Sequence, residues 1–183
     1  MKSLAVFCGS KKGILPEYTE AARQLGLILA QENIELIYGG GNVGLMGVIA
    51  DTVMENSGKV TGIIPEKLME LEVGHQGISE LIVVKDMHER KALINKLSDG
   101  FLCLPGGIGT LEEIFEVFTW GRIGYHQKPC ALYNVAGFYN PLVDMLTHTT
   151  TQGFMSDETQ QELLVNEDIE ALLQEMQKVH LSN

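Results

Sequence analysis

The sequence predicts an α/β protein with a Rossmann-like, doubly wound parallel sheet, helices on both faces, and a single domain covering residues 1–183. Two observations predict this fold. Short apolar runs of strand length alternate with longer segments of helical periodicity, which is the pattern of βαβ units. Two of these runs also lead directly into glycine-rich turns and helix starts, which favours ligand binding at the carboxyl ends of the strands. The length suits one well-buried domain and is too short for separate cofactor and substrate domains.

The strands follow from apolar runs bounded by turn residues. In chain order, strands are expected at residues 4–8, 34–38, 60–64, 81–85, 101–104 and 129–133. Residues 66–80 have an irregular pattern with two glycines. They predict a loop that could fold over a site.

The helices follow from apolar residues at a spacing of three and four. The first helix is expected to begin at Pro16, and the second to follow the turn 39–47 and to stop near Gly58. A third is expected at residues 86–98, a fourth after Thr110, and a fifth from Asn140. The tail from Ser156 onward is expected to be helical. Its apolar face consists of Ile169, Leu172, Met176 and Val179, which predicts a helix that packs against the rest of the protein.

Composition limits the partners. The 24 acidic and 13 basic residues give a formal net charge of -11, which disfavours nucleic acid and anionic membranes as partners. The cysteines, Cys8, Cys103 and Cys130, are odd in number and lie in apolar runs, which predicts buried, reduced thiols and a cytoplasmic protein. No targeting segment or membrane span is evident. The five histidines show no metal-ligand spacing, so no metal is expected.

The segment that follows the strand at 101–104 is the first candidate site. Gly106, Gly107 and Gly109 let the backbone approach a ligand, and the helix start behind them is a ready anion site. Thr110 and Glu113 also match the Thr-x-x-Glu capping box, which alone would explain both residues without chemistry. Both interpretations stay open at this point.

A second glycine motif follows the strand at 34–38. Gly39, Gly41 and Gly44 match the dinucleotide-binding fingerprint. The acidic residue that should follow the next strand is misplaced, because Glu66 comes after Pro65 and outside that strand, which disfavours a nicotinamide cofactor. Glycines needed only for a tight turn and close helix packing are the alternative. In one small domain, both glycine loops are expected to serve the same ligand.

The third candidate is the start of the helix at 86–98. Asp86 and Glu89 form a helix start signal, so Arg90 and Lys91 lie in the first turns, where the helix dipole disfavours cations. Two cations there indicate an anionic ligand, and solvated surface residues are the alternative. Lys85 and Lys91 are the candidates for a pyridoxal phosphate Schiff base, but neither has the surroundings that this cofactor needs, so no cofactor is expected.

The motifs Met87-His-Glu-Arg90-Lys91 and Pro105-Gly-Gly-Ile-Gly-Thr-Leu-Glu-Glu113, at this separation, resemble the LOG family of cytokinin riboside 5'-monophosphate phosphoribohydrolases. The resemblance covers nearly the whole chain. It implies a Rossmann-like fold, a homodimer, and hydrolysis of the N-glycosidic bond of nucleoside 5'-monophosphates, such as AMP and N6-prenylated AMP, to free base and ribose 5-phosphate. Members are often labelled lysine decarboxylase-like, for which this sequence gives no chemical reason.

The resemblance also implies roles for individual residues. Arg90 and Glu113 correspond to the catalytic pair. Contacts to the substrate are expected from Lys91, Gly107, Ile108, Gly109, Thr110, Leu111, Glu112, Glu72 and Thr119, together with Ser10, Gly41 and Gly44 from the other two turns. The chain departs from the family pattern at Glu72-Val-Gly-His-Gln, where Glu-x-Thr-Gly-Glu is usual, and at Lys11, where a second serine is common.

The implied chemistry is coherent with these residue types. Breaking the glycosidic bond builds positive charge on the ribose, so a carboxylate is required near C1'. Glu113 could activate a water molecule or stabilise the cation directly, and the sequence leaves both open. It also leaves open a nucleotide-binding sensor or carrier without catalysis, and whether the purpose is cytokinin activation or nucleotide salvage.

Overall fold

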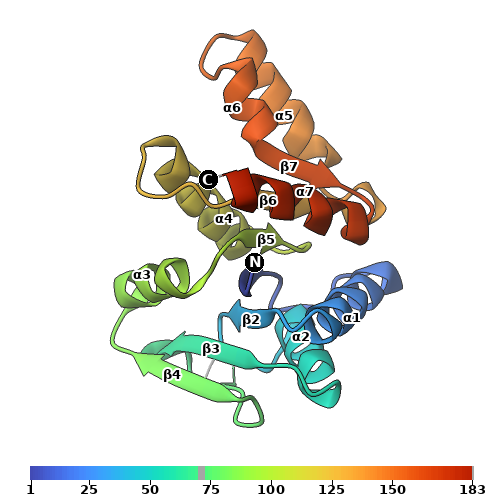
Figure 1. Ribbon diagram of the computed structural model, residues 1–183, viewed down its shortest axis with the longest axis vertical. Coiled ribbons are helices and arrows are strands. Elements are labelled where there is room, and N and C mark those ends of the chain that lie inside the picture. Colours follow the sequence, from blue (N-terminus) through green and yellow to red (C-terminus); the bar gives the residue numbers. More distant parts are fainter. Residues whose placement is uncertain (70–72, 183) are drawn as a thin grey trace.

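The computed structural model describes residues 1–69 and 73–182, in which seven parallel strands form one sheet in the order β4-β3-β2-β1-β5-β6-β7 (Figure 1). The strands are β1 (Ser3–Phe7), β2 (Glu35–Tyr38), β3 (Val60–Pro65), β4 (Glu80–Val84), β5 (Phe101–Cys103), β6 (Cys130–Tyr133) and β7 (Leu163–Asn166). The chain builds outward from β1 to β4 and then returns to place β5 on the other side of β1. This confirms the predicted doubly wound sheet, with its switch point between β1 and β5.

Helices cover both faces of the sheet. They are α1 (Pro16–Gln31), α2 (Gly44–Glu55), α3 (Met87–Leu97), α4 (Ile108–Arg122), α5 (Asn140–Thr151), α6 (Asp157–Glu162) and α7 (Ile169–Ser182), with short 3-10 turns η1 (Glu66–Leu68) and η2 (Val135–Gly137). In Figure 1, α1, α2 and α7 lie on one side of the sheet and α3 and α4 on the other, while α5 and α6 project beyond β7.

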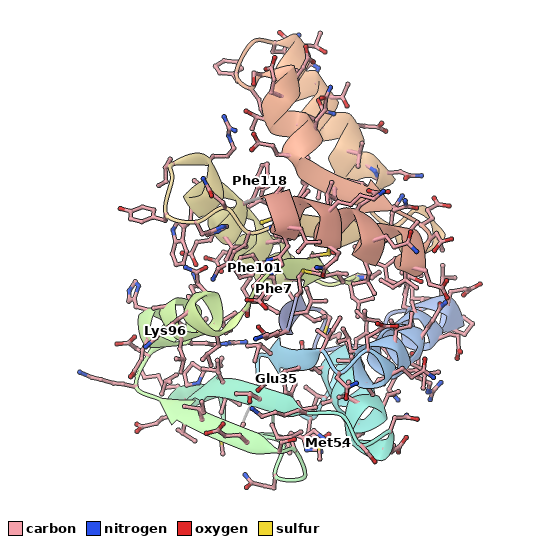
Figure 2. The ribbon with its side chains drawn as sticks, in the orientation of Figure 1. Phe7, Glu35, Met54, Lys96, Phe101 and Phe118 are labelled. Carbon is pink, nitrogen blue, oxygen red and sulfur yellow. The ribbon has the colours of Figure 1, made fainter. Side chains whose placement is uncertain are left out.

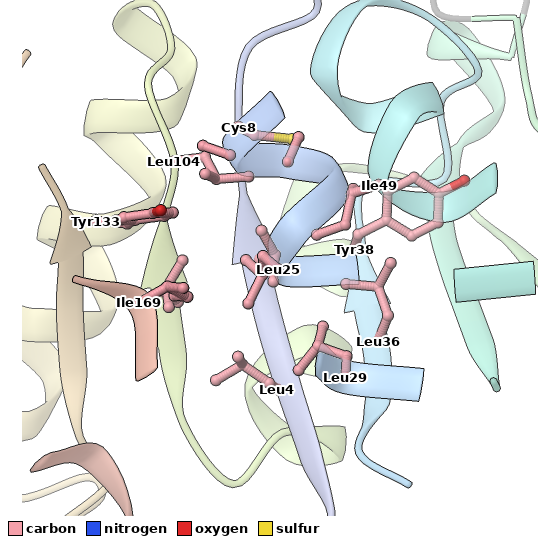
Figure 3. Packing of buried hydrophobic residues seen from close by; sticks show 14 of the residues in the cluster. Leu4, Cys8, Leu25, Leu29, Leu36, Tyr38, Ile49, Leu104, Tyr133 and Ile169 are labelled. Carbon is pink, nitrogen blue, oxygen red and sulfur yellow. The ribbon is translucent and has the colours of Figure 1, made fainter. Parts of the chain in front are cut away.

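The first core lies between the sheet and α1, α2 and α7. Leu4 of β1 and Leu36 of β2 meet Leu25 and Leu29 of α1, and all four side chains are fully buried (Figure 3). Ile169 brings α7 onto the same face. Strands buried on both faces carry continuous apolar runs, which is why these segments were recognisable in the sequence.

The second core fixes the helices that carry the candidate site. Phe7 of β1 and Phe101 of β5 stack with ring centroids 6.2 Å apart and planes at 5° (Figure 2). Ile94 of α3 and Ile114 of α4 are buried against this layer. The apolar stripes of α3 and α4 therefore set the position of both helices over the switch point.

The prediction of a helical tail from Ser156 onward was wrong in part. Ser156 does cap a helix, accepting a hydrogen bond from the Thr159 N–H at 3.2 Å, but α6 ends at Glu162 and β7 follows. The run Leu163–Asn166 pairs in parallel with β6, so pairing with a neighbouring strand outweighs the local helical pattern. The amphipathic end of the tail is confirmed as α7, whose residues Ile169, Leu172 and Met176 are buried.

Part of the irregular segment 66–80 packs closely on the second glycine turn. Gly74 forms an antiparallel bridge with Gly41, and His75 is 6% exposed, with its Nε2 2.9 Å from Asp51 Oδ1 of α2. These contacts hold the described part of the loop against α2. Among residues 1–69 and 73–182, no helix is long and apolar enough to cross a membrane.

Candidate active site

A cleft of about 570 Å³ opens at the carboxyl ends of β1 and β5, where the strand order reverses. This size is typical of small-molecule sites, and the switch point is where open α/β sheets bind ligands. The turn after β1 and the turn after β5 form its floor, and side chains from α1, α2, α3 and α4 form its walls.

The two turns are joined by backbone hydrogen bonds. The Leu104 N–H donates to the Phe7 carbonyl at 2.9 Å, and the Gly9 N–H donates to the Pro105 carbonyl at 3.1 Å. Past this point, Gly107 and Gly109 line the cleft, and a Cβ added to either would meet no described atom within 4 Å. The missing side chains thus leave the N-terminus of α4 open to the cleft, as an anion site requires.

The predicted capping box at Thr110 and Glu113 was wrong. The helix begins earlier than expected, with Gly107 as the N-cap residue in extended conformation, so Thr110 lies inside the first turn and is 5% exposed. A glycine is acceptable at an N-cap, and the helix therefore does not need the threonine there. Glu113 is consequently not the partner of a capping threonine, and another role must account for it.

Glu113 forms an ion pair with Arg90. Arg90 Nη2 of α3 lies 3.3 Å from Glu113 Oε1 of α4, and the two side chains are 6% and 13% exposed. Both residues line the cleft. Arg90 Nη1 also donates to Met87 Sδ at 3.8 Å, while its buried Nε has no hydrogen-bond partner among the described residues. A half-buried carboxylate therefore faces the cleft beside a buried guanidinium group that has an unused N–H donor.

Gly39 makes room for the guanidinium group. A Cβ at position 39 would lie 2.2 Å from Arg90 Nη2, a distance that no real contact allows. The first glycine of the second motif thus serves the ion pair, by close approach of backbone to side chain. No feature of the sequence indicated this, because positions 39 and 90 meet only in the folded chain.

The expected start of α3 at Asp86 is confirmed. Asp86 Oδ1 accepts hydrogen bonds from the N–H groups of His88 and Glu89, both at 3.0 Å, and Glu89 Oε2 accepts one from the Lys85 N–H at 2.9 Å. The hydrogen bond from the Glu89 N–H is the main reason why the pKa of Asp86 lies below its ordinary value. This cap stabilises the start of α3, whose first turns also contain Arg90 and Lys91, where the helix dipole disfavours cations.

Lys91 points to a different partner from Arg90. Its Nζ donates to Glu112 and, at 3.2 Å, to Glu116 Oε1, and its side chain is 16% exposed. Burial lowers the pKa of Lys91, but the hydrogen bonds to Glu112 and Glu116 outweigh burial and raise the pKa above its ordinary value. Lys91 therefore links α3 to α4 and does not itself line the cleft.

The structure brings most of the predicted site residues together. Besides Arg90 and Glu113, the cleft is lined by Ser10, Gly107, Ile108, Gly109, Thr110 and Glu112. Of the described residues that were expected to contact substrate, Gly41, Gly44, Lys91, Leu111 and Thr119 do not line it. Glu72 lies outside the described residues.

Local contacts account for several residues away from the cleft. Gly44 has φ +60°, and a Cβ there would lie 2.2 Å from the carbonyl carbon of Ser10, so it allows α2 to pack against the turn after β1. This supports the packing interpretation of the second glycine motif. Thr119 Oγ1 donates to the Phe115 carbonyl at 2.6 Å, and Leu111 packs against the second core.

Several cleft residues were not predicted from the sequence. Lys11 and Lys12 line the cleft beside Ser10, and Tyr18 of α1 and Phe138, which follows η2, form a T-shaped aromatic pair with ring centroids 5.7 Å apart. The departure from the family pattern at Lys11 was one available signal. For Phe138 there was none, because only the order of the strands brings the end of β6 beside the start of α1.

The thiols agree with the expectation from the sequence. Cys8, Cys103 and Cys130 are all buried, and burial raises the pKa of Cys103 and of Cys130 to about 12. In the part of the chain that the structure describes, no group of three or more histidine, cysteine, aspartate or glutamate side chains is arranged to hold a metal ion.

Comparison with known proteins identifies the family. The family described as "possible lysine decarboxylase" matches residues 46–176. The chain is 43% identical over 173 residues to the cytokinin riboside 5'-monophosphate phosphoribohydrolase of Rhodococcoides fascians, covering 94% of this chain and 87% of that protein. It is 47% identical over 155 residues to an Arabidopsis thaliana enzyme of the same name, covering 85% and 71%.

Solved structures support the fold. A molybdenum cofactor binding protein of Rippkaea orientalis superposes with a TM-score of 0.73 at 21% identity, covering 97% of this chain and 96% of that one. The molybdenum cofactor carrier protein of Chlamydomonas reinhardtii gives 0.72 at 17% identity, covering 99% and 98%. At these identities the likeness concerns the fold alone. From its relatives, the chain belongs to the LOG family of cytokinin riboside 5'-monophosphate phosphoribohydrolases.

Proposed function

We propose that this protein is a phosphoribohydrolase that cleaves the N-glycosidic bond of nucleoside 5'-monophosphates, including AMP and N6-modified AMP. The products would be the free base and ribose 5-phosphate. One observation carries the proposal: an ion pair between buried Arg90 and half-buried Glu113, with a distance of 3.3 Å, faces a cleft next to an open helix N-terminus. The names of relatives at 43% and 47% identity agree with this activity.

The 5'-phosphate would bind at the N-terminus of α4. Gly107 and Gly109 leave its N–H groups uncovered, and the positive end of the helix dipole favours an anion there. Glu113 lies four residues further along the same helix, roughly 6 Å at 1.5 Å per residue. A sugar whose phosphate binds at the helix start would therefore have its ring near the carboxylate.

Glu113 would act at C1' of the ribose. As the bond from C1' to the base nitrogen breaks, positive charge develops on the sugar and a carboxylate stabilises it. The oxygen of a water molecule forms the new bond to C1', and its proton can pass to Glu113 if the carboxylate acts as a general base. The nucleobase leaves with the bonding electrons and takes up a proton.

Arg90 would orient the carboxylate and the substrate. Its ion pair fixes Glu113 in one arrangement, and its guanidinium group, which lines the cleft, can donate to a ribose or phosphate oxygen.

The test is product formation. Purified protein is incubated with AMP, with isopentenyl-AMP and with adenosine, and free base is separated by chromatography. We expect base from the monophosphates and much less from adenosine. Absence of base from every nucleoside monophosphate, with tight nucleotide binding by calorimetry, would instead support a nucleotide sensor or carrier.

We propose further that the enzyme is a cytoplasmic homodimer. The reduced, buried thiols support a reducing compartment. The dimer is supported by apolar side chains that stay exposed on and after α4, such as Ile108 at 86% and Ile123 at 63%. Light scattering coupled to gel filtration should give twice the chain mass of 20.1 kDa.

A further inference from the structure

We infer that Lys11 and Lys12, in the turn after β1, bind the 5'-phosphate of the substrate and make the enzyme select nucleotides over nucleosides. This inference rests on the proposed function and deepens it. Both lysines line the cleft and are exposed. Within residues 1–69 and 73–182, neither forms an ion pair or a side-chain hydrogen bond, so both charges are available to a ligand.

The charge of the cleft depends on these two residues. Its other ionised side chains are already paired, Arg90 with Glu113 and Glu112 with Lys91. Two uncompensated positive charges thus remain at one place in a chain of formal net charge -11. A phosphate monoester carries about -1.5 to -2 at neutral pH, which matches the lysine pair. The acidic remainder of the surface would repel the same ligand.

The position of the turn brings the lysines to the helix N-terminus. Gly9, two residues before Lys11, donates its N–H to Pro105 at 3.1 Å, and a Cβ on Gly9 would lie 3.4 Å from the Gly106 Cα. The turn after β1 therefore lies directly against the turn that opens α4. Lysine has a long, flexible side chain, so both ammonium groups can approach a phosphate held there.

The backbone of this turn is fixed from its other side. Leu45 at the start of α2 donates its N–H to the Gly9 carbonyl at 3.0 Å. Gly44 packs so closely that a Cβ would lie 2.3 Å from the Lys11 nitrogen. Because the turn is held between the starts of α2 and α4, the backbone of both lysines is already ordered before a ligand binds. Less conformational entropy is therefore lost on binding.

The experiment compares Lys11→Ala, Lys12→Ala and the double variant with the wild type. Because both side chains are exposed, melting temperatures should stay unchanged. We expect the double variant to raise KM for AMP roughly tenfold, the effect of losing charge-assisted contacts, with kcat changed less than about twofold. Lys178→Ala on α7 removes an equal charge from an exposed lysine outside the cleft and should leave KM unchanged.

Salt and a minimal ligand give independent readouts. Raising the salt concentration should increase KM of the wild type and have little effect on the double variant, because salt screens exposed charges. Inorganic phosphate should bind the wild type, by calorimetry, and bind the double variant about tenfold more weakly. Lys12→Arg should retain most of the binding, because the charge is kept.

The outcomes separate this inference from the proposed function. An unchanged KM for AMP together with unchanged phosphate binding in the double variant would overturn the inference even if AMP is hydrolysed. A fall in kcat at constant KM would also overturn it, because phosphate recognition would not then be the role of the pair. If no base is released but phosphate binding is lost in the double variant, the proposed function fails, and of the inference only the assignment of Lys11 and Lys12 as a phosphate site stands.

Discussion

Glu113 and Arg90 come from different helices, yet they form an ion pair and both line the cleft. The resemblance to the LOG family predicted that both residues belong to the active site. For Arg90, its place in the first turns of α3, where the helix dipole disfavours cations, also indicated a role in binding an anion. The motifs did not predict the ion pair, because its geometry depends on how α3 and α4 pack on Phe7 and Phe101. The space at Gly39 depends on the same packing.

The first prediction concerns the charge of Glu113. In Glu113→Gln the amide keeps the shape of the side chain and loses its charge, so kcat for AMP should fall at least about a hundredfold. The unfolding free energy should fall by only about 1–3 kcal/mol, because a buried arginine loses its counter-ion. Base release and urea unfolding measure both effects. Glu170→Gln, an exposed carboxylate of α7, is the control. A wild-type rate in the variant would remove Glu113 from the mechanism.

The second prediction concerns the space above Gly109. A Cβ there meets no described protein atom within 4 Å, so Gly109→Ala should fold normally, with a stability gain of up to about 1 kcal/mol from the lower entropy of the unfolded chain. The methyl group would occupy the cleft beside the helix start, so KM for AMP and the dissociation constant for phosphate should rise. Thermal melting and kinetics measure the two effects, and an unchanged KM would show that the ligand binds elsewhere.

At the scale of elements, α3 and α4 act as one unit. They share the second core, and Lys91 joins them through Glu112 and Glu116. Arg90 and Lys91 are neighbours in sequence and point about 100° apart around the helix, so Arg90 reaches the cleft and Glu113, while Lys91 reaches Glu112 and Glu116. The sequence indicated an anionic ligand for both cations, whereas the structure pairs Lys91 with two carboxylates of α4.

The third prediction tests this link. Lys91→Met leaves Glu116 without its cation, and Glu116 Oε2 already has no hydrogen-bond partner among the described residues, so unfolding free energy should fall by about 1–3 kcal/mol. The loss should be smaller when Glu116→Gln is already present, which a double-mutant cycle measures by urea unfolding.

Lys96→Met is the matched control for this cycle. Lys96 is on the same helix, is exposed, and forms no ion pair in the described part of the chain (Figure 2). Its replacement should be neutral within about 0.5 kcal/mol. If Lys91 instead contacts the nucleotide, the main effect of Lys91→Met will be on KM for AMP, with stability unchanged.

Two elements show why local patterns are insufficient. The Thr-x-x-Glu pattern at Thr110 looks like a helix start, but Gly107 already provides the cap and the helix extends across the glycines. The segment Leu163–Asn166 looks like a continuation of a helix, but it becomes strand β7 because β6 offers an unpaired edge. In both places the outcome is set by neighbours that are distant in sequence.

At the scale of the whole molecule, the alternation of strands and helices was sufficient to predict the doubly wound sheet. The strand order then determines the site, because the turns after β1 and β5 meet only where the order reverses. The sequence could not indicate that the end of β6 brings Phe138 to Tyr18 of α1.

The fourth prediction concerns alkaline pH. Burial raises the pKa of Cys103 and of Cys130 from about 9 to about 12, so the folded protein holds these protons more tightly than the unfolded chain. The associated stability is fully present below pH 9 and is lost as pH rises towards 12. For each thiol, the free energy of unfolding should fall by about 1.4 kcal/mol per pH unit across this window. Burial raises the pKa of Tyr139 as well, which acts in the same direction.

Urea unfolding at pH 8, 9.5 and 10.5 measures this slope. In Cys130→Ala, the slope of unfolding free energy against pH should be smaller by the contribution of that thiol. At pH 8 the variant should lose stability only because packing around the removed sulfur is lost. A flat profile up to pH 10.5 in the wild type would contradict the assignment of buried, protonated thiols.

The close approach of Gly39 to Arg90 has a consequence for how this family diverges. A Cβ at position 39 would lie 2.2 Å from Arg90 Nη2, so a side chain there requires the guanidinium group to leave its present position beside Glu113. A related protein that lacks the arginine is released from this constraint and can accept a larger residue at position 39. The two positions should therefore vary together, and a larger residue in place of this glycine would indicate, from a sequence alone, that the Arg90–Glu113 pair is altered or lost.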